Sequence, residues 1–258
     1  MTPEAFERFS TRLRDNLAGR PDVLGLVLMG STAARHRADE WSDHDFAVVT
    51  VDGGAEGIRS DLGWLPDVGE VALAVREDHD GHKVVHDDGH VLEFGVTTID
   101  GLRHWQTNAY EVTLDRGGVA DAFRWVAARD KPGASTTARR ELALFVTLLL
   151  IGTGRCRRGD VLVAGQLIRT YALAHLIAAW RLLRPVDGAD RRDELDPFRR
   201  FEQVYPEAGA AIADALERDV ETAARRLLDL AETEFGAEPD FPVRGVAAIR
   251  RRLDWDTP

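Results

Sequence analysis

The sequence has almost no cysteine and no apolar run long enough to cross a membrane. One cysteine, Cys156, stands among 258 residues, which excludes an internal disulfide and fits a reducing compartment. The longest apolar run, from 142 to 151, falls far short of the roughly 20 residues that span a bilayer. The N-terminus contains acids and arginines but no apolar signal core. These absences predict a soluble cytoplasmic protein with no membrane partner.

Positive charge is also scarce relative to negative charge. The chain has 33 lysine and arginine residues against 44 aspartate and glutamate residues, so its formal net charge is −11. Binding to nucleic-acid phosphates needs a basic face, and this balance therefore argues against a nucleic-acid polymer as the main substrate. An acidic protein suits a cationic small molecule, although acidity is also a common means of staying soluble.

Length and apolar content predict one large domain or two small ones. With 44% hydrophobic residues, the chain can bury an ample core. Strand-like runs dominate as far as about residue 100, and helix-like patterns follow. Lys131-Pro132-Gly133 is the clearest linker. The predicted fold class is α+β, with a mixed β-sheet domain over 1–130 and an all-helical bundle domain over 131–258.

Local patterns place the expected elements along the chain. A helix that begins after Thr2 is predicted over 3–17, because its apolar residues recur at three- and four-residue spacing. Asp-Gly pairs are typical of hairpins, and two of them predict a meander of three strands. The predicted strands span 25–29, a segment beginning at 43, 71–75, 82–86 and 91–97. Helices are predicted over 102–114 and 119–128, and throughout the chain from residue 136 onward.

Two aspartates, Asp43 and Asp45, open the second apolar strand. Because successive side chains of a strand alternate between its faces, both carboxylates are expected on one side, with His44 packed in the core on the other. Mg²⁺ prefers one or two carboxylates together with substrate phosphates. Two such ions can clamp the attacking and leaving oxygens of a phosphoryl displacement. Asp43 and Asp45 are therefore candidate metal ligands and catalytic residues.

A glycine-serine pair, Gly30-Ser31, ends the first strand. Gly30 lets a phosphate approach the backbone closely, and Ser31 adds a hydroxyl and an N–H group at a helix start. Arg35 is the candidate for neutralising phosphate charge, and the alternative is a solvated arginine. Ser42 is the candidate donor to a γ-phosphate, and the alternative is a turn residue. Together with the acid pair, these residues predict nucleotidyl transfer.

The pattern Gly30-Ser31, eleven residues, then Asp43-His44-Asp45 resembles the signature of the nucleotidyltransferase superfamily that includes DNA polymerase beta. The flanking residues, from Met29 to Arg35 and from Asp39 to Asp43, resemble those of the bacterial adenylyltransferases that act on aminoglycosides and lincosamides. The resemblance covers roughly residues 20 to 100. The resemblance implies ATP as donor, AMP as the transferred group, two Mg²⁺ ions and a third carboxylate from a later strand. Glu93 matches that carboxylate, either as a metal ligand or as a general base.

The predicted function is metal-dependent transfer of AMP from ATP to a hydroxyl of a small molecule, such as an aminoglycoside or lincosamide antibiotic, with release of pyrophosphate. Two alternatives stay open. The first is a nucleotidyltransferase that modifies a protein or an RNA, as toxin-neutralising members of the superfamily do. The second is a nucleotide-binding scaffold without catalysis. An idle cluster of buried carboxylates is destabilising, which counts against the scaffold.

Overall fold

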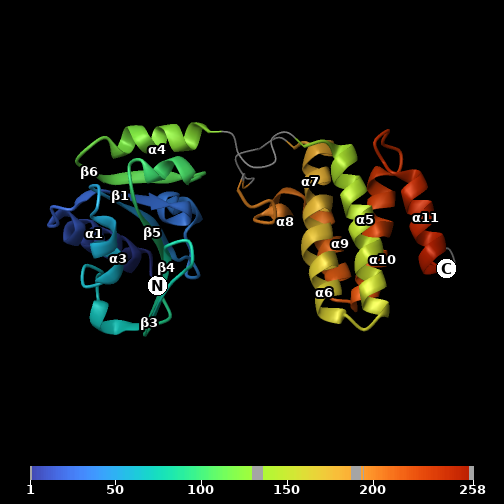
Figure 1. The fold of residues 1–258 in the computed structure, drawn as a ribbon, viewed down its shortest axis with the longest axis horizontal. Coiled ribbons are helices and arrows are strands. Elements are labelled where there is room, and N and C mark those ends of the chain that lie inside the picture. The colour runs from blue at the N-terminus through green and yellow to red at the C-terminus, as the bar shows by residue number, and fades with distance from the viewer. Residues whose placement is uncertain (1, 130–135, 187–192, 194, 256–258) are drawn as a thin grey trace. The chain divides into compact units, whose positions relative to one another are not determined.

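A computed structural model describes residues 2–129, 136–186, 193 and 195–255. The chain divides into two compact units, Met1–Lys131 and Pro132–Pro258. The first contains a mixed six-stranded sheet, and the described part of the second is built from helices (Figure 1). This arrangement confirms the predicted α+β class. The predicted linker at 131–133 lies outside the described residues.

The sheet of the first unit has the strand order β3-β4-β5-β2-β1-β6. β2 and β5 pair in parallel, and the other neighbouring strands pair antiparallel. The predicted meander is present as β3, β4 and β5. The strands are β1 (Val23–Met29), β2 (His44–Thr50), β3 (Val71–Arg76), β4 (Gly81–His86), β5 (Val91–Thr98) and β6 (Tyr110–Asp115).

The helix predicted over 102–114 is wrong. A short 3-10 turn, Gly101–His104, is followed by β6, which pairs antiparallel with β1 at the edge of the sheet. Tyr110, Val112 and Leu114 alternate with polar residues, which is the period of a strand. The sheet domain therefore extends past residue 100, and α4 (Val119–Ala128) also belongs to it.

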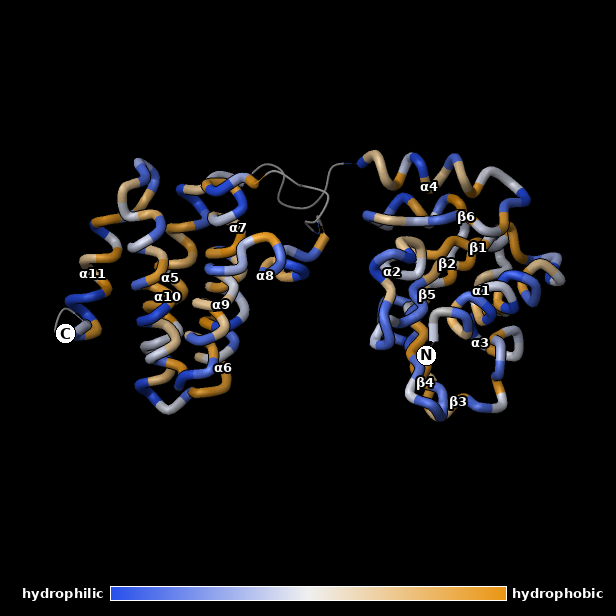
Figure 2. The backbone as a smooth tube through the Cα atoms, turned by 180° about the vertical axis from the view of Figure 1, so that it is seen from behind, coloured by the Kyte–Doolittle hydropathy of each residue, from blue (hydrophilic) through white to orange (hydrophobic). Residues whose placement is uncertain are grey.

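Helices cover both faces of this sheet. α1 (Pro3–Ala18) and α3 (Ala55–Ser60) pack on the face that carries Phe46, whereas α4 packs on the face of Ala47 and Val49 (Figure 1). α1 begins as predicted, since the Thr2 hydroxyl accepts a hydrogen bond from the third residue after it. Alternate residues of β2 face opposite sides, so Asp45 belongs to the face of Ala47 and Val49. The hydrophobicity of the central strands is visible in Figure 2.

A pair of buried histidines fills the space between α1 and the sheet. His44 Nδ1 lies 2.7 Å from His90 Nε2, and His44 Nε2 lies 3.0 Å from Ser10 Oγ. The His44 ring stacks on Phe6 with a centroid distance of 3.7 Å. Burial lowers the pKa of His44 to about 3 and the pKa of His90 to about 4. The prediction that His44 is a packed core histidine is confirmed, and both rings are neutral at pH 7.

The second unit packs its helices against α5 (Ala138–Arg157). Apolar and polar positions alternate along α5 and its neighbours, as Figure 2 shows. Buried Glu141 of α5 lies 2.5 Å from His175 Nδ1 and ties α5 to α7. The remaining segments are α6 (Val161–Gln166), a π-helical turn (Leu167–Ala172), α7 (Leu173–Leu183), α8 (Phe201–Val204), α9 (Pro206–Leu216), α10 (Val220–Phe235) and α11 (Val243–Leu253).

One helical stretch in this unit, Val161–Leu183, is long and apolar enough to cross a membrane by length and composition alone. The longest uninterrupted apolar run in the sequence, 142–151, does not include this stretch, because polar residues interrupt the stretch. Within the unit, Leu176, Ile177 and Trp180 of this stretch join the hydrophobic core. A core helix of a soluble protein passes the same test, so this stretch alone does not assign a membrane location.

Candidate active site

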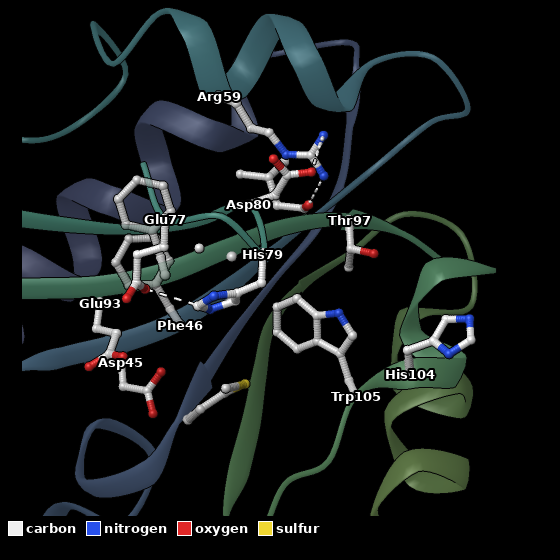
Figure 3. Close-up of a pocket in the computed structure, with 15 residues that line it drawn as sticks. Asp45, Phe46, Arg59, Glu77, His79, Asp80, Glu93, Thr97, His104 and Trp105 are labelled. Carbon is white, nitrogen blue, oxygen red and sulfur yellow. Dashed lines mark hydrogen bonds and ion pairs between the residues drawn. The ribbon is translucent and has the colours of Figure 1, made fainter. Parts of the chain in front are cut away.

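A pocket of about 460 Å³ lies along β2 and β5 in the first unit (Figure 3). Four carboxylate residues line it: Asp45, Glu77, Asp80 and Glu93. Trp105 supplies an aromatic wall, because a Cβ added to Gly95 would lie 2.5 Å from Trp105 Cη2. Gly95 therefore leaves room for the indole ring of Trp105.

Strand register brings three charged residues into one row. Asp45 of β2 pairs with Glu93 of β5, and Glu93 pairs with Lys83 of β4. Directly opposed residues of neighbouring strands project from the same face of a sheet. Asp45 and Glu93 accordingly lie at one end of the pocket (Figure 3). The structure thus brings two predicted site residues together and adds Lys83, which belongs to no recognisable motif.

Lys83 forms an ion pair with Glu93. Its Nζ lies 2.5 Å from Glu93 Oε1 and 3.8 Å from Glu77 Oε2. The hydrogen bond with Glu93 raises the pKa of Lys83, and the charges of Glu93, Glu77 and Asp43 raise it further. Glu93 was predicted as a metal ligand or as a general base, and in this structure its carboxylate is paired with an ammonium group. Half-exposed pairs of this kind contribute little to stability.

A buried threonine, Thr32, fixes the two aspartates. It belongs to α2 (Gly30–Ala33), and its hydroxyl donates to the Asp43 carbonyl oxygen at 3.2 Å. The same hydroxyl accepts the Asp45 backbone N–H at 2.8 Å. Asp43 lies directly before β2 rather than inside it. Thr32 was not among the predicted site residues, and its place immediately after Gly30-Ser31 was its only signal in the sequence.

Gly30 adopts a left-handed conformation with φ of +54°. A Cβ built on it would lie 3.0 Å from Asp45 Oδ2. Its N–H already donates to the Ala109 carbonyl oxygen at 3.1 Å. Glycine is therefore favoured at this position, because other residues rarely adopt this backbone angle and their Cβ would crowd the Asp45 carboxylate. Ser31 follows it in α2.

Replacing Gly30 with alanine is expected to harm the site more than the fold. Positive φ costs an alanine about 1 kcal/mol, and the new methyl would displace the Asp45 carboxylate. We expect the nucleotidyl transfer predicted from the sequence to fall about tenfold or more, because small misplacements of reacting groups are costly. Gly53→Ala is the matched control, since Gly53 has φ of +79° and open space around it. Equal losses of activity in the two variants would contradict this assignment.

Arg35 and Ser42 are engaged away from the pocket. The Arg35 guanidinium forms an ion pair with Glu7 of α1 and lies 5.5 Å from the centroid of the Phe6 ring. Ser42 Oγ accepts the Asp39 N–H at 2.9 Å and lies 3.2 Å from Asp39 Oδ1, so it closes a turn. The helix α1 attracts Arg35 because Glu7 presents a carboxylate there. Neither residue lines the pocket that contains Asp45 and Glu93.

Two other cations lie at the site. Arg37 donates from Nη2 to the Gly30 carbonyl oxygen at 3.2 Å. Arg59 of α3 lines the pocket, donates to the Val96 carbonyl oxygen at 2.6 Å and lies 3.8 Å from Asp80 Oδ2. Arg37 lies two residues after the predicted phosphate-neutralising residue Arg35, whereas Arg59 carries no recognisable sequence signal.

The residues predicted to bind metal are Asp43, Asp45 and Glu93. Among the residues that the structure describes, no group of three or more His, Cys, Asp or Glu side chains is arranged to hold a metal ion. Asp43 and Asp45 provide two carboxylates, the number that Mg²⁺ takes alongside phosphate oxygens. Glu93 is paired with Lys83. A three-carboxylate set therefore remains a prediction.

The fold and pocket define an α+β protein with an acid-lined pocket at a parallel strand pair. No family model and no curated protein matches the chain. It is similar to an aminoglycoside 6-adenyltransferase from Bacillus subtilis, with 12% identity, a TM-score of 0.31, and coverage of 96% of this chain and 91% of that one. It is also similar to a chain of the E. coli MS115-1 CdnC:HORMA-deltaN complex, with 12% identity, a TM-score of 0.31, and coverage of 97% and 90%. Likeness of this degree assigns no activity.

Proposed function

We propose that the chain is a metal-dependent nucleotidyltransferase that transfers AMP from ATP to a hydroxyl of a small molecule, such as an aminoglycoside or lincosamide antibiotic. The observation that carries the proposal is the pairing of Asp45 with Glu93 across parallel strands, beside left-handed Gly30. A candidate metal ligand, Asp45, and a candidate proton acceptor, Glu93, fixed on adjacent strands in one pocket suit the metal-assisted displacement that the sequence motif predicts. Cytoplasmic ATP is the proposed donor.

Each residue has a role that its contacts support. Asp43 and Asp45, anchored through Thr32, would hold Mg²⁺, which supplies charge neutralisation at the phosphates. Arg37 takes the phosphate-neutralising role first assigned to Arg35, because its guanidinium already lies at Gly30. The γ-phosphate role of Ser42 is not retained, since its hydroxyl closes a turn.

The chemical step conserves every atom of donor and acceptor. The acceptor hydroxyl gives its proton to Glu93, which faces the same end of the pocket as Asp45 (Figure 3). The acceptor oxygen bonds to the α-phosphorus, and the bond from that phosphorus to the bridging oxygen of the β-phosphate breaks. Pyrophosphate leaves with the bond electrons, and AMP stays on the acceptor.

The pocket lining favours a cationic acceptor. Glu77 and Asp80 add carboxylates beyond Asp45 and Glu93, and Trp105 presents an aromatic surface. Amines gain from both, through charge attraction and through contact with an indole face. An aminoglycoside carries several amines next to hydroxyls, so it meets both requirements of this pocket.

The test is pyrophosphate release from ATP, GTP, CTP and UTP with Mg²⁺, against a panel of aminoglycosides and lincosamides. We expect release that needs one nucleotide and one class of drug. If the chain binds a nucleotide but releases no pyrophosphate with any of the drugs, the acceptor is expected to be a protein or an RNA instead. A chain that binds no nucleotide contradicts the proposal altogether.

A further inference from the structure

We infer that the site holds one divalent ion rather than two, because Lys83 occupies the cation position at Glu93. The inference rests on the proposed function and settles a role that the sequence left open. Glu93 is then not a metal ligand, and its carboxylate remains the group that receives the hydroxyl proton. Lys83 acts as a positioning residue, because it acts through Glu93.

The first support is the register of three strands. Lys83, Glu93 and Asp45 lie directly opposite one another on β4, β5 and β2. An ion bridging Asp45 and Glu93 would enter this row next to the Lys83 ammonium, which lies 2.5 Å from Glu93 Oε1. Like charges repel at such separations, so a second divalent ion is disfavoured there.

The second support is the set of carboxylates around the ammonium. Lys83 Nζ also lies 3.8 Å from Glu77 Oε2. The Lys83 ammonium therefore lies near both Glu93 and Glu77, whereas no group of three described acids is arranged around a metal position. Glu93, the third carboxylate of the predicted set, is thus already paired with a cation.

The third support is the choice of residue. Of the 33 lysine and arginine residues, two are lysines, Lys83 and Lys131. The other ion pairs that the structure describes in the sheet unit use arginine or, between Glu77 and His79, histidine. An ammonium is a compact point charge, and a guanidinium is a wide planar fork. A compact charge is the better substitute for a small metal ion between strands.

The test counts Mn²⁺ bound to the full chain by electron paramagnetic resonance of the free ion. We expect one Mn²⁺ per wild-type chain, with affinity lowered about tenfold or more by Asp45→Asn and changed little by Glu93→Gln. Lys83→Gln should admit a second Mn²⁺, and adding Glu93→Gln to it should remove that ion again. Lys83→Arg keeps the charge and should still bind one.

Lys131→Gln is the matched control, because it removes the same charge elsewhere in the chain, and it should still bind one ion. Two Mn²⁺ ions on the wild-type chain, none at all, or one that depends on Glu93 would overturn the inference. Two ions together with pyrophosphate release uphold the proposed function while overturning this inference. One ion that depends on Asp45 but not on Glu93, without release for any acceptor, supports the inference and contradicts the function.

Discussion

Asp45→Asn is expected to lower pyrophosphate release about a thousandfold, which corresponds to about 4 kcal/mol of transition-state stabilisation. The substitution removes one negative charge from the group that would hold Mg²⁺ while keeping the size of the side chain. The fold should survive, because Asp45 is anchored to Thr32 through its backbone N–H, which asparagine also has. We therefore expect the melting temperature to stay within a few degrees of wild type.

The measurement is steady-state release at saturating ATP and Mg²⁺, with circular dichroism to compare thermal unfolding. Asp78→Asn is the matched control, since it removes the same charge from another Asp-x-Asp pair at an exposed position outside the pocket lining. Its rate should equal that of wild type. An Asp45→Asn chain that is folded and keeps a tenth of the wild-type rate would show that Asp45 is not a metal ligand.

Local patterns predicted Asp45 and Glu93, which both line the pocket. The Gly30-Ser31 pair and the acid pair were recognisable because turns and strand starts have short-range codes. The meander placed Glu93 on a strand, and the register then set it beside Asp45. β6 overlaps the helix predicted over 102–114, although the segment from Tyr110 to Asp115 alternates as a strand does.

The charge partners of single side chains were harder to derive than the strands. Lys83 and Glu93 are ten residues apart on the β4–β5 hairpin and meet through its antiparallel register, which follows from the position of the turn. Arg35 was assigned to phosphate because it follows Gly30-Ser31, yet its guanidinium pairs with Glu7 on α1. For Arg35, a helix distant in sequence decides which charge the side chain meets.

The first unit is expected to lose stability in mild acid because His44 and His90 are buried in neutral form. Unfolded histidines titrate near pH 6.5, whereas burial lowers the pKa of His44 to about 3 and that of His90 to about 4. Below pH 6.5 the unfolded state therefore binds protons that the folded state does not, and stability falls as pH falls. Between pH 6.5 and 4.5 the loss amounts to about 4 kcal/mol for the pair.

The position of the pair explains why protonation is resisted. His44 faces His90, Ser10 Oγ and the Phe6 carbonyl oxygen, and Arg35 and His86 add unfavourable charge nearby, while Asp88 favours a charged His90. The measurement is pulsed hydrogen exchange after equilibration in urea at each pH. Peptides from β2 and β5 then report the stability of this unit separately from that of the helical unit. His44→Gln should remove about half of the pH dependence, and exposed His79→Gln should leave it unchanged. A stability that is flat between pH 6.5 and 4.5 would mean that water reaches both rings.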